Sequence, residues 1–407
     1  CKQTLDADGD VSDQGDAAVR APPSCEASGA GGPSPRSSIA GGVVHGRMLV
    51  LSGDEGTSNR CGHLTRGATD TWQLLWCKGW GSVKGKMPGA RSAAASVSSP
   101  EQSATYVYGG RFRTANAGAW VLRGDLWRYD GKDLIWQRLS SAGPPPRAQA
   151  ALGLRRSTNT LYLFGGNAAV LDGSDFALSD IWSFDQAKSK WQRLHPIAGP
   201  QKRFGHVAAV SEDDRYLVVF GGIQKQVGVI APMNDTWRLD LDTLTWQQIS
   251  AGASAPSGRL GAGLLRYPGF AGLLLFGGRD GSQVDHRNDL WSVNPVSGAW
   301  QMLRTGDLGA NGSLGRPAQA AKDTCAPPAG FTQIDLKSPE RRRDFIWGVE
   351  PGSGRIWLFG GRGDCGPMRD AWTLHLPTLT WQLHEPSTAG WSCLRSSVKC
   401  ASLWTPQ

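Results

Sequence analysis

Arginine is the residue type whose spacing first indicates chemistry in this chain of 407 residues. Five arginines each lie 18 residues before the first glycine of a Gly-Gly pair, and a sixth lies 16 residues before Ser52. A guanidinium group presents a planar fork of N–H donors that can bind a carboxylate or sulfate through two parallel hydrogen bonds. If these side chains face one axis, they form a positive ring suited to an acidic ligand. The candidate ligand-binding residues are Arg36, Arg91, Arg147, Arg203, Arg259 and Arg342.

Each arginine opens a repeated segment whose centre is an apolar run ending in two glycines. Four or five β-branched, aromatic or leucyl residues in a row predict a buried β-strand. A glycine pair ends such a strand where the backbone adopts a conformation that side chains disfavour, or passes close to a neighbour. The copies are TYVYGG at 105–110, LYLFGG at 161–166, YLVVFGG at 216–222, LLLFGG at 273–278 and IWLFGG at 356–361, with a degenerate MLVLSG at 48–53.

Two tryptophans follow each of these runs and predict a β-hairpin, because a polar turn separates them. A buried tryptophan removes roughly 150–250 Å² from water, so a neighbouring sheet must cover it. A period near 50 residues is typical of a β-propeller, in which each sheet covers the next around a ring. The tryptophan pairs are Trp72 and Trp80, Trp127 and Trp136, Trp182 and Trp191, Trp237 and Trp246, Trp291 and Trp300, and Trp372 and Trp381.

Together these features resemble the kelch-repeat β-propellers. The resemblance rests on the opening arginine, the glycine pair, the strand that reads NDTW, SDIW, GDLW, NDLW or RDAW, and the closing tryptophan. It implies an all-β fold, a six-bladed kelch-type β-propeller with four antiparallel strands, a to d, in each blade. We expect a propeller at 35–385, with blades at about 35–84, 90–140, 146–195, 202–250, 258–303 and 342–385.

The kelch strand order directs attention to one face of the propeller. Antiparallel alternation places the arginines, the d–a connections and the long, irregular b–c loops on the same face, where variable loops commonly build binding sites. An insertion at 304–341 is a d–a connection and should emerge there too. Two roles stay open for the arginines. They could form a ligand-facing ring at the mouth of the channel, or they could bond nearby carbonyls and carboxylates and hold adjacent blades.

The remaining segments are tails. Residues 1–34 contain few large apolar residues and predict a solvated N-terminal tail. Residues 386–407 contain Trp391 and Trp404, so we expect part of this C-terminal tail to pack on the ring.

Eight cysteines in tails, loops or strand ends predict disulfide bonds, and hence an extracellular or secretory-pathway compartment. Cys325 with Cys365 is the preferred pair, Cys61 with Cys77 is a second, and a bond between the tails would close the ring covalently. Reduced thiols in a cytoplasmic protein are the alternative. The sequons at Asn311 and Asn234 would then be candidates for glycosylation, Asn311 being the better one. The disulfide candidates are Cys1, Cys25, Cys61, Cys77, Cys325, Cys365, Cys393 and Cys400.

The charge and hydropathy of the chain restrict the classes of partner that it is expected to bind. The formal net charge of +8 is spread along the chain, which favours an acidic partner and shows no nucleic-acid signature. No apolar run approaches the roughly 20 residues of a membrane span, so no membrane insertion is expected.

The family resemblance also admits enzymes. A galactose-oxidase-like copper site needs two Tyr, two His and a Cys, but no His-rich loop faces the tyrosines of this chain. The iron motif of nitrile-specifier-like proteins matches at Glu340 and Asp344 but has Gly348 in place of the histidine. A mutarotase-like site needs only Arg, Glu and His around the channel and stays open. We therefore predict no catalytic residue, metal or cofactor.

The favoured interpretation is a non-catalytic kelch propeller that binds a protein or an acidic glycan through its b–c loop face, outside the cytosol. A carbohydrate-acting enzyme that uses the channel mouth and an intracellular adaptor are the alternatives.

Overall fold

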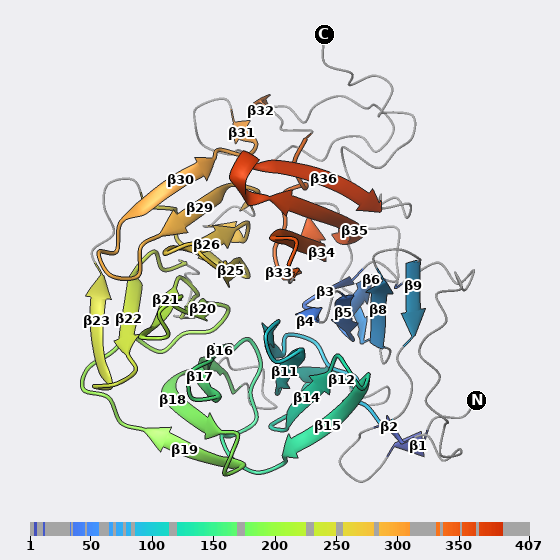
Figure 1. Cartoon of the computed structure of the whole chain (residues 1–407), viewed down its shortest axis with the longest axis vertical. Helices are drawn as coiled ribbons and strands as arrows, with labels where there is room; N and C mark the ends of the chain where they lie inside the picture. The colour runs from blue at the N-terminus through green and yellow to red at the C-terminus, as the bar shows by residue number, and fades with distance from the viewer. Residues whose placement is uncertain are drawn as a thin grey trace.

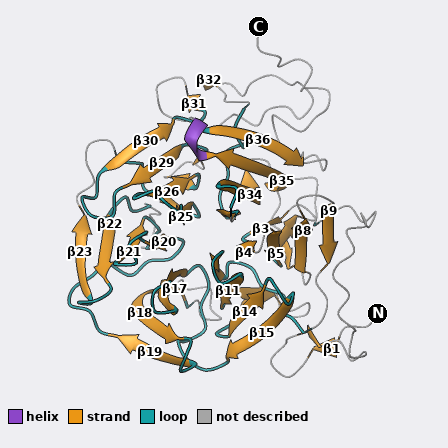
Figure 2. Cartoon of the chain, in the orientation of Figure 1, coloured by secondary structure: helices purple, strands orange, loops and turns teal. Residues whose placement is uncertain are grey.

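The computed structural model describes most of the repeated region. The described residues are 4–5, 11–12, 33, 36–44, 47–56, 65–67, 71–75, 79–82, 86–113, 120–168, 176–224, 232–249, 255–280, 285–309, 331–333, 337–350, 352–363 and 366–385. Within these ranges the fold is all-β, apart from one short 3-10 helix, η1 (Leu376–Thr378). The strands lie around a central channel (Figure 1), and loops and turns join them at both ends (Figure 2).

Antiparallel units of four strands, one from each sequence repeat, surround the channel, and five of them are separate sheets. Their strands are β4 (Ala40–Val44), β5 (Arg47–Leu51), β8 (Thr71–Leu75) and β9 (Gly79–Ser82); β10 (Ala95–Ser99), β11 (Ala104–Tyr108), β14 (Leu126–Asp130) and β15 (Ile135–Ser140); β16 (Ala151–Arg155), β17 (Thr160–Asn167), β18 (Ala177–Asp185) and β19 (Lys190–Leu194); β20 (Val207–Val210), β21 (Tyr216–Phe220), β22 (Thr236–Asp240) and β23 (Thr245–Ile249); and β25 (Gly263–Arg266), β26 (Leu273–Phe276), β29 (Leu290–Val293) and β30 (Trp300–Arg304).

The last repeat differs from the expected separate blade. Its strands β33 (Ile346–Val349), β34 (Arg355–Gly363), β35 (Gly366–His375) and β36 (Thr380–Glu385) pair with one another. The short strand β3 (Arg36–Ser37) then pairs with β35, which extends the unit into a seven-stranded sheet. The expectation of six separate four-stranded blades is thus corrected: five stand alone, and the start of the first repeat joins the last unit to the first.

We call the face that carries the b–c loops the loop face, and the face that carries the a–b and c–d turns the turn face. The b–c loops, expected to be irregular, contain short antiparallel strand pairs in the described residues. In each case the segment that follows the glycine pair can pair with the segment that leads back to strand c. These strands are β6 (Asp54–Gly56) with β7 (Thr65–Gly67), β12 (Arg111–Arg113) with β13 (Trp120–Leu122), and β27 (Arg279–Asp280) with β24 (Arg259–Leu260) and β28 (Asp285–His286). The remaining short pairs are β1 (Thr4–Leu5) with β2 (Val11–Ser12), and β31 (Leu308–Gly309) with β32 (Phe331–Gln333).

A closed circle of backbone hydrogen bonds joins the repeats on the loop face. The residue two positions after each opening arginine donates its N–H to the carbonyl of its counterpart in the neighbouring repeat, at 2.7–3.0 Å. All of these residues have a left-handed φ between 54° and 67°. The donors and acceptors run from Ala93 to Ser38, Gln149 to Ala93, Gly205 to Gln149, Gly261 to Gly205, Asp344 to Gly261 and Ser38 to Asp344. Because the circle closes, every repeat is tied to both neighbours at the channel mouth.

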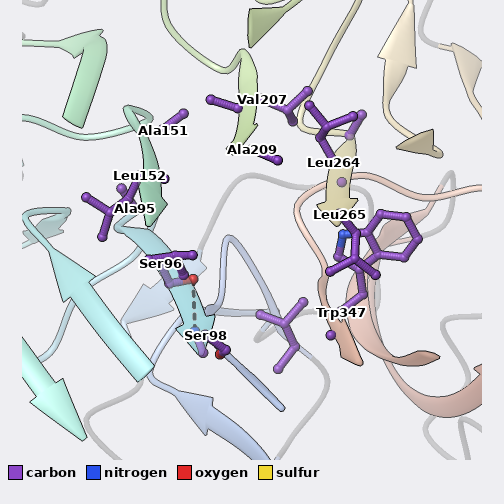
Figure 3. A pocket seen from close by; sticks show the side chains of 18 of the residues that line it. Ala95, Ser96, Ser98, Ala151, Leu152, Val207, Ala209, Leu264, Leu265 and Trp347 are labelled. Atoms are coloured by element: carbon purple, nitrogen blue, oxygen red, sulfur yellow. Dashed lines mark hydrogen bonds between the residues drawn. The ribbon is translucent and has the colours of Figure 1, made fainter. Parts of the chain in front are cut away.

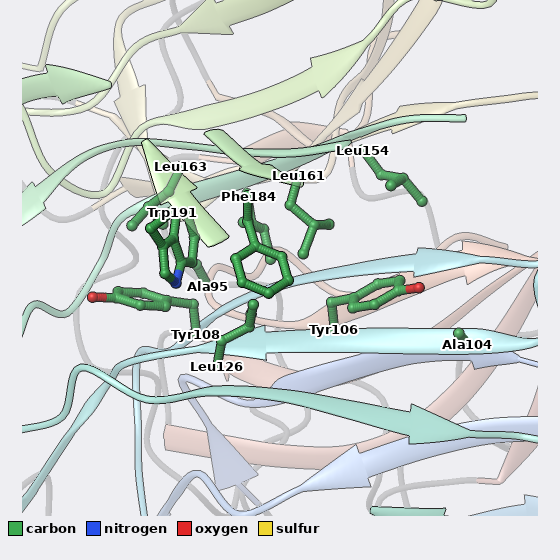
Figure 4. Packing of buried hydrophobic residues seen from close by; sticks show 11 residues of the cluster. Ala95, Ala104, Tyr106, Tyr108, Leu126, Leu154, Leu161, Leu163, Phe184 and Trp191 are labelled. Carbon is green, nitrogen blue, oxygen red and sulfur yellow. The ribbon is translucent and has the colours of Figure 1, made fainter. Parts of the chain in front are cut away.

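Aromatic side chains fill the space between adjacent units, as the tryptophan spacing predicts. Between the second and third repeats, Tyr106 and Tyr108 face Phe184 and Trp191 (Figure 4). The ring centroids of Tyr108 and Trp191 are 5.4 Å apart in an edge-to-face arrangement. Each such contact buries apolar surface that a single four-stranded sheet would leave in water.

Candidate functional site

The five regular arginines are buried inside their own blades, each at most 2% exposed. The guanidinium group of each arginine binds the aspartate that lies two residues before the first tryptophan of its repeat. Nη1 lies 2.6–2.8 Å from one carboxylate oxygen and Nη2 lies 2.6–3.0 Å from the other. Nη1 also donates to the carbonyl of the first glycine at 2.9–3.0 Å. The pairs are Arg91 and Asp125, Arg147 and Asp180, Arg203 and Asp235, Arg259 and Asp289, and Arg342 and Asp370.

The first tryptophan of each pair completes this arrangement, which we call the Arg–Asp–Trp clasp. Its indole N–H donates to the same aspartate at 2.5–2.7 Å. Burial alone raises the pKa of Asp180, but the hydrogen bonds and charge of Arg147 outweigh it, so the pKa falls below its ordinary value. The pKa of Asp125, Asp235 and Asp289 is lowered in the same way. The clasp therefore holds an ionised pair with its donors satisfied.

The backbone of each clasp arginine also links two units. Its carbonyl accepts a hydrogen bond from the second glycine of the preceding repeat, for example Gly222 N to Arg259 O at 2.8 Å. In the first repeat, Arg36 donates to the carbonyl of Ser52 at 3.1 Å and pairs with Met368 of the last unit. The expected ligand-facing ring is therefore corrected. The guanidinium groups lie inside the blades, and the alternative role, holding adjacent blades, fits the geometry.

The other candidates from the sequence lie apart from one another. All eight cysteines, Asn311 and the C-terminal tail lie outside the described residues, so those expectations stay predictions. Asn234 is exposed on the loop face, while Thr236 of its sequon is buried and accepts a hydrogen bond from Trp300 at 3.1 Å. Glu340 is buried, and its backbone carbonyl accepts a hydrogen bond from Arg342 Nε.

The channel itself is a narrow cavity of about 260 Å³ lined by the inner strand of every repeat. Figure 3 shows Ser96 and Ser98 on one side and Leu264, Leu265 and Trp347 on another. Ser96 Oγ accepts the N–H of Gly41 at 3.2 Å, and Ser98 Oγ lies 2.8 Å from Thr105 Oγ1. The serine hydroxyls are thus used to join strands.

An ionic network that the sequence analysis missed lies at the turn-face end of the channel. Arg156 and Arg266 each contact the same three carboxylates, Glu101, Glu212 and Asp214, at 3.3–3.7 Å. These residues come from the a–b turns of four successive repeats. Burial, and then the charge of Arg156, lower the pKa of Arg266, whereas the three carboxylates act in the opposite direction. A signal was present in the sequence, because glutamate and arginine alternate at near-equivalent turn positions.

The residues just beyond the clasps differ from repeat to repeat and surround the loop-face mouth. In each repeat the residue after the arginine pairs through its backbone with the residue after the glycine pair. We call these the mouth pairs. They are Ser37 and Asp54, Ser92 and Arg111, Ala148 and Asn167, Phe204 and Ile223, Leu260 and Arg279, and Arg343 and Arg362. The same backbone geometry therefore carries acidic, apolar and basic side chains in different sectors of one rim, where the four arginines are partly exposed and the other eight side chains are buried.

The stems of the insertion are held against the fifth repeat. Asn288 accepts the N–H of Asp307 at 2.9 Å and donates to the carbonyl of Pro339 at 3.1 Å. A buried ion pair of 3.4 Å joins Asp307 to Arg341 at the other end of the insertion. The insertion thus starts and ends at one anchored point near the loop face.

The described residues contain no helix that is long and apolar enough to cross a membrane. Within the same ranges, no group of three or more His, Cys, Asp or Glu side chains is placed to hold a metal ion.

Comparison with known proteins gives partial matches to large proteins. The flagellar outer arm dynein alpha chain of Chlamydomonas reinhardtii is 24% identical over 255 residues, which are 61% of this chain and 5% of that protein. Acyl-CoA-binding domain-containing protein 4 of Arabidopsis thaliana is 28% identical over 134 residues, 33% of this chain and 19% of that protein. The host cell factor homolog hcf-1 of Caenorhabditis elegans is 23% identical over 198 residues, which are 45% of this chain and 24% of that protein. The chain spans at most about a quarter of these relatives.

The match to a family model covers more of the chain. The model of the KLHDC2/KLHL20/DRC7 Kelch-repeats domain matches residues 23–211 and 102–320, so the two stretches together cover 23–320. That range includes the clasps and glycine pairs of four consecutive repeats. On this match and on the repeated clasp geometry, the chain belongs to the kelch-repeat family.

Proposed function

We propose that this kelch propeller is a non-catalytic protein-interaction module that binds its partner on the loop face. The observation that carries the proposal is the contrast within each repeat. The clasp residues are the same in five repeats and their arginines are buried, whereas the mouth pairs share a backbone, differ in chemistry and leave four arginines partly exposed. Side chains that the scaffold does not require, held on a rigid rim, are suited to recognition.

The chemistry of the rim favours an acidic partner. Basic mouth residues occur in the second, fifth and sixth repeats, at Arg111, Arg279, Arg343 and Arg362, and each of them is partly exposed. Phe204 and Ile223 of the fourth repeat are buried against Leu260, so they support the rim from within and leave the arginines as its accessible mouth residues. Opposite charge across an interface speeds association and selects among partners. We therefore propose a protein segment that carries carboxylates, with an acidic glycan as the competing ligand class.

Peptide selection followed by hydrogen exchange tests this function. A display library of random 12-residue peptides would be selected on the full chain, and exchange would be measured with and without the strongest peptide. Protection is expected in the b–c loops and mouth pairs, with the a–b and c–d turns unchanged. Protection of the turn face alone would contradict the proposal. Selective binding of sialylated or sulfated glycans, or turnover in a sugar oxidation and mutarotation screen, would favour the glycan-binding or enzymatic alternative.

We also propose that the protein works in an oxidising compartment, outside the cell or in the secretory lumen. The support is the even number of cysteines in loops and tails of the sequence. Thiol titration of the denatured chain, purified from its natural source without reductant, tests this. Few or no free thiols are expected, whereas eight free thiols would support an intracellular adaptor.

A further inference from the structure

The described ends of the b–c loop of the second repeat, 111–113 and 120–124, are basic and aromatic. Residues 111–124 read RFRTANAGAWVLRG, with three arginines and no acidic residue. Strands β12 and β13 pair Phe112 with Val121. The guanidinium carbon of Arg111 lies 4.3 Å from the ring centroid of Trp120, and that of Arg123 lies 4.4 Å from the ring centroid of Phe112. These two cation–π contacts hold the hairpin in a defined shape.

Arg111 differs from the clasp arginines in its hydrogen bonds. Among the described residues its side chain forms no salt bridge, and its Nε is buried without a hydrogen-bond partner. The charge of Arg111 also acts on Asp54 of the first repeat. Burial raises the pKa of Asp54, while a hydrogen bond from Ser92 and the charge of Arg111 act to lower it. A partly buried guanidinium group with unused N–H donors is suited to bind a carboxylate of a partner molecule.

Two exposed apolar side chains lie in the b–c loops of the second and third repeats, which are neighbours in the ring. Val121 of the hairpin is 37% exposed, and Phe176, in the b–c loop of the third repeat, is 57% exposed. Two hydrogen bonds hold the Phe176 backbone: its N–H donates to Asn167 Oδ1 at 3.1 Å, and its carbonyl accepts the N–H of Ala168 at 2.9 Å. The other large exposed apolar side chains in the described ranges lie on outer strands, c–d turns and a d–a connection. They are Ile135, Ile197, Val296, Met302 and Leu383.

We infer that the described residues of the b–c loops of the second and third repeats, above all Arg111, Val121 and Phe176, form the anchoring surface for a partner protein segment that carries an apolar side chain beside carboxylates. This inference rests on the proposed function and locates it in one sector of the rim. Aromatic side chains and arginines are the residue types that most often dominate binding energy in protein interfaces. A nucleic acid fits less well, since binding to phosphate backbones requires a longer basic stripe.

The test uses the strongest 12-residue peptide from the library selection, labelled with fluorescein, and fluorescence anisotropy on the full chain. Selected peptides should be enriched in Asp or Glu next to Leu, Ile or Phe. Arg111→Met keeps a long side chain over Trp120 but removes the charge, and Phe176→Ser removes the apolar anchor. Each change is expected to weaken binding about tenfold, as for a central interface residue.

Matched controls lie on the turn face. Arg215 has a side chain that is 56% exposed, and Val296 is 57% exposed. Arg215→Met and Val296→Ala should change the Kd by less than about twofold, since both lie far from the proposed contact in the fold. All four variants should retain the thermal midpoint of the unaltered chain to within about 2 °C, because surface substitutions cost little stability.

Three results would overturn the inference, and they differ in meaning. If peptides bind but only Arg343→Met weakens them, the interaction function stands and the sector is wrong. If the library yields no binding peptide, the proposed function fails as well. If a labelled 20-residue single-stranded oligonucleotide binds more tightly than every peptide, and Arg111→Met weakens it, the surface recognises a polyanion and not a protein segment.

Discussion

The two ends of the channel are held together by different means. At the loop-face end the contacts repeat: a closed circle of backbone hydrogen bonds, and a clasp in five of the units. At the turn-face end, Arg156 and Arg266 bind three carboxylates from the second and fourth repeats, with no equivalent arrangement elsewhere in the described residues. Contacts that recur in every repeat close the ring, whereas contacts made once add to it locally. Disrupting the recurring contacts and the single network separately should therefore give different losses of stability.

Acid should have the largest effect, because it acts on several clasps at once. The pKa of Asp125, Asp180, Asp235 and Asp289 is depressed in the folded chain. Their contribution is therefore fully present above the unfolded pKa of about 3.9 and is lost as pH falls through the folded values. We expect the free energy of unfolding, measured with urea, to decrease gradually as the pH falls below about 6.5, because burial lowers the pKa of His206 to about 3 in the folded chain. It should then fall steeply below about pH 4, where the clasp carboxylates become protonated. The absence of this second, steeper decrease down to about pH 2 would show that the clasps contribute little.

Removing one clasp carboxylate should give the second-largest effect on stability. Asp235→Ala leaves the buried Arg203 guanidinium group without its ion partner, and this should lower the free energy of unfolding by about 3–5 kcal/mol. The matched control is Asp242→Ala, which breaks the exposed pair with Arg155 and should cost below about 1 kcal/mol. Urea unfolding of both variants gives the comparison. Equal losses would mean that burial of the clasp does not matter.

A pair of glycine substitutions tests the close approach between units. Gly221 has φ of 71°, and an added Cβ would lie 2.5 Å from the carbonyl oxygen of Arg259 in the next repeat. Gly269 has φ of 74° but no atom within 4 Å of an added Cβ. Gly269→Ala should cost about 1–2 kcal/mol for backbone strain alone. Gly221→Ala should cost about 2 kcal/mol more, because it also forces two units apart. Thermal and urea unfolding would reveal whether the two variants differ.

The turn-face network should give the smallest effect. Arg266→Met removes one of its two cations, leaves Arg156 to bind the carboxylates, and should lower the free energy of unfolding by about 1 kcal/mol. Because the network is partly exposed, this difference should shrink in 1 M NaCl, where the Debye length is about 3 Å. A loss that is as large as that of Asp235→Ala, and is insensitive to salt, would show that the two ends of the channel are held alike.

Much of the fold could be predicted from local patterns. The apolar runs, the glycine pairs and the tryptophan pairs each mark a strand or a turn within about 30 residues of chain, so periodicity alone located them. The role of the arginines could not be decided in that way. Arg203 and Asp235 are 32 residues apart, and their contact depends on the register between strands a, b and c. The aspartate was visible in NDTW, but nothing in the spacing paired it with the arginine.

The candidate site was harder to predict than the scaffold. The b–c loops were correctly placed on the face that carries the arginines, yet the residues that line its mouth follow the motifs and vary in type. Asn288 and Asn234 occupy the same repeat position, but Asn288 is buried and holds the insertion while Asn234 is exposed. Sequence patterns treat them alike, because the difference comes from a neighbouring segment that packs on only one of them.

By itself, the sequence determined the number of repeats, the order of strands within each and the positions where only glycine is tolerated, because these depend on short-range sterics and on the period of apolar residues. Only the tertiary structure decided which acceptors the arginines bind, how the first repeat joins the last, and which side chains remain available at the rim. Those outcomes require atoms from different repeats to meet. Ring closure brings them together only once every unit has packed against its neighbours.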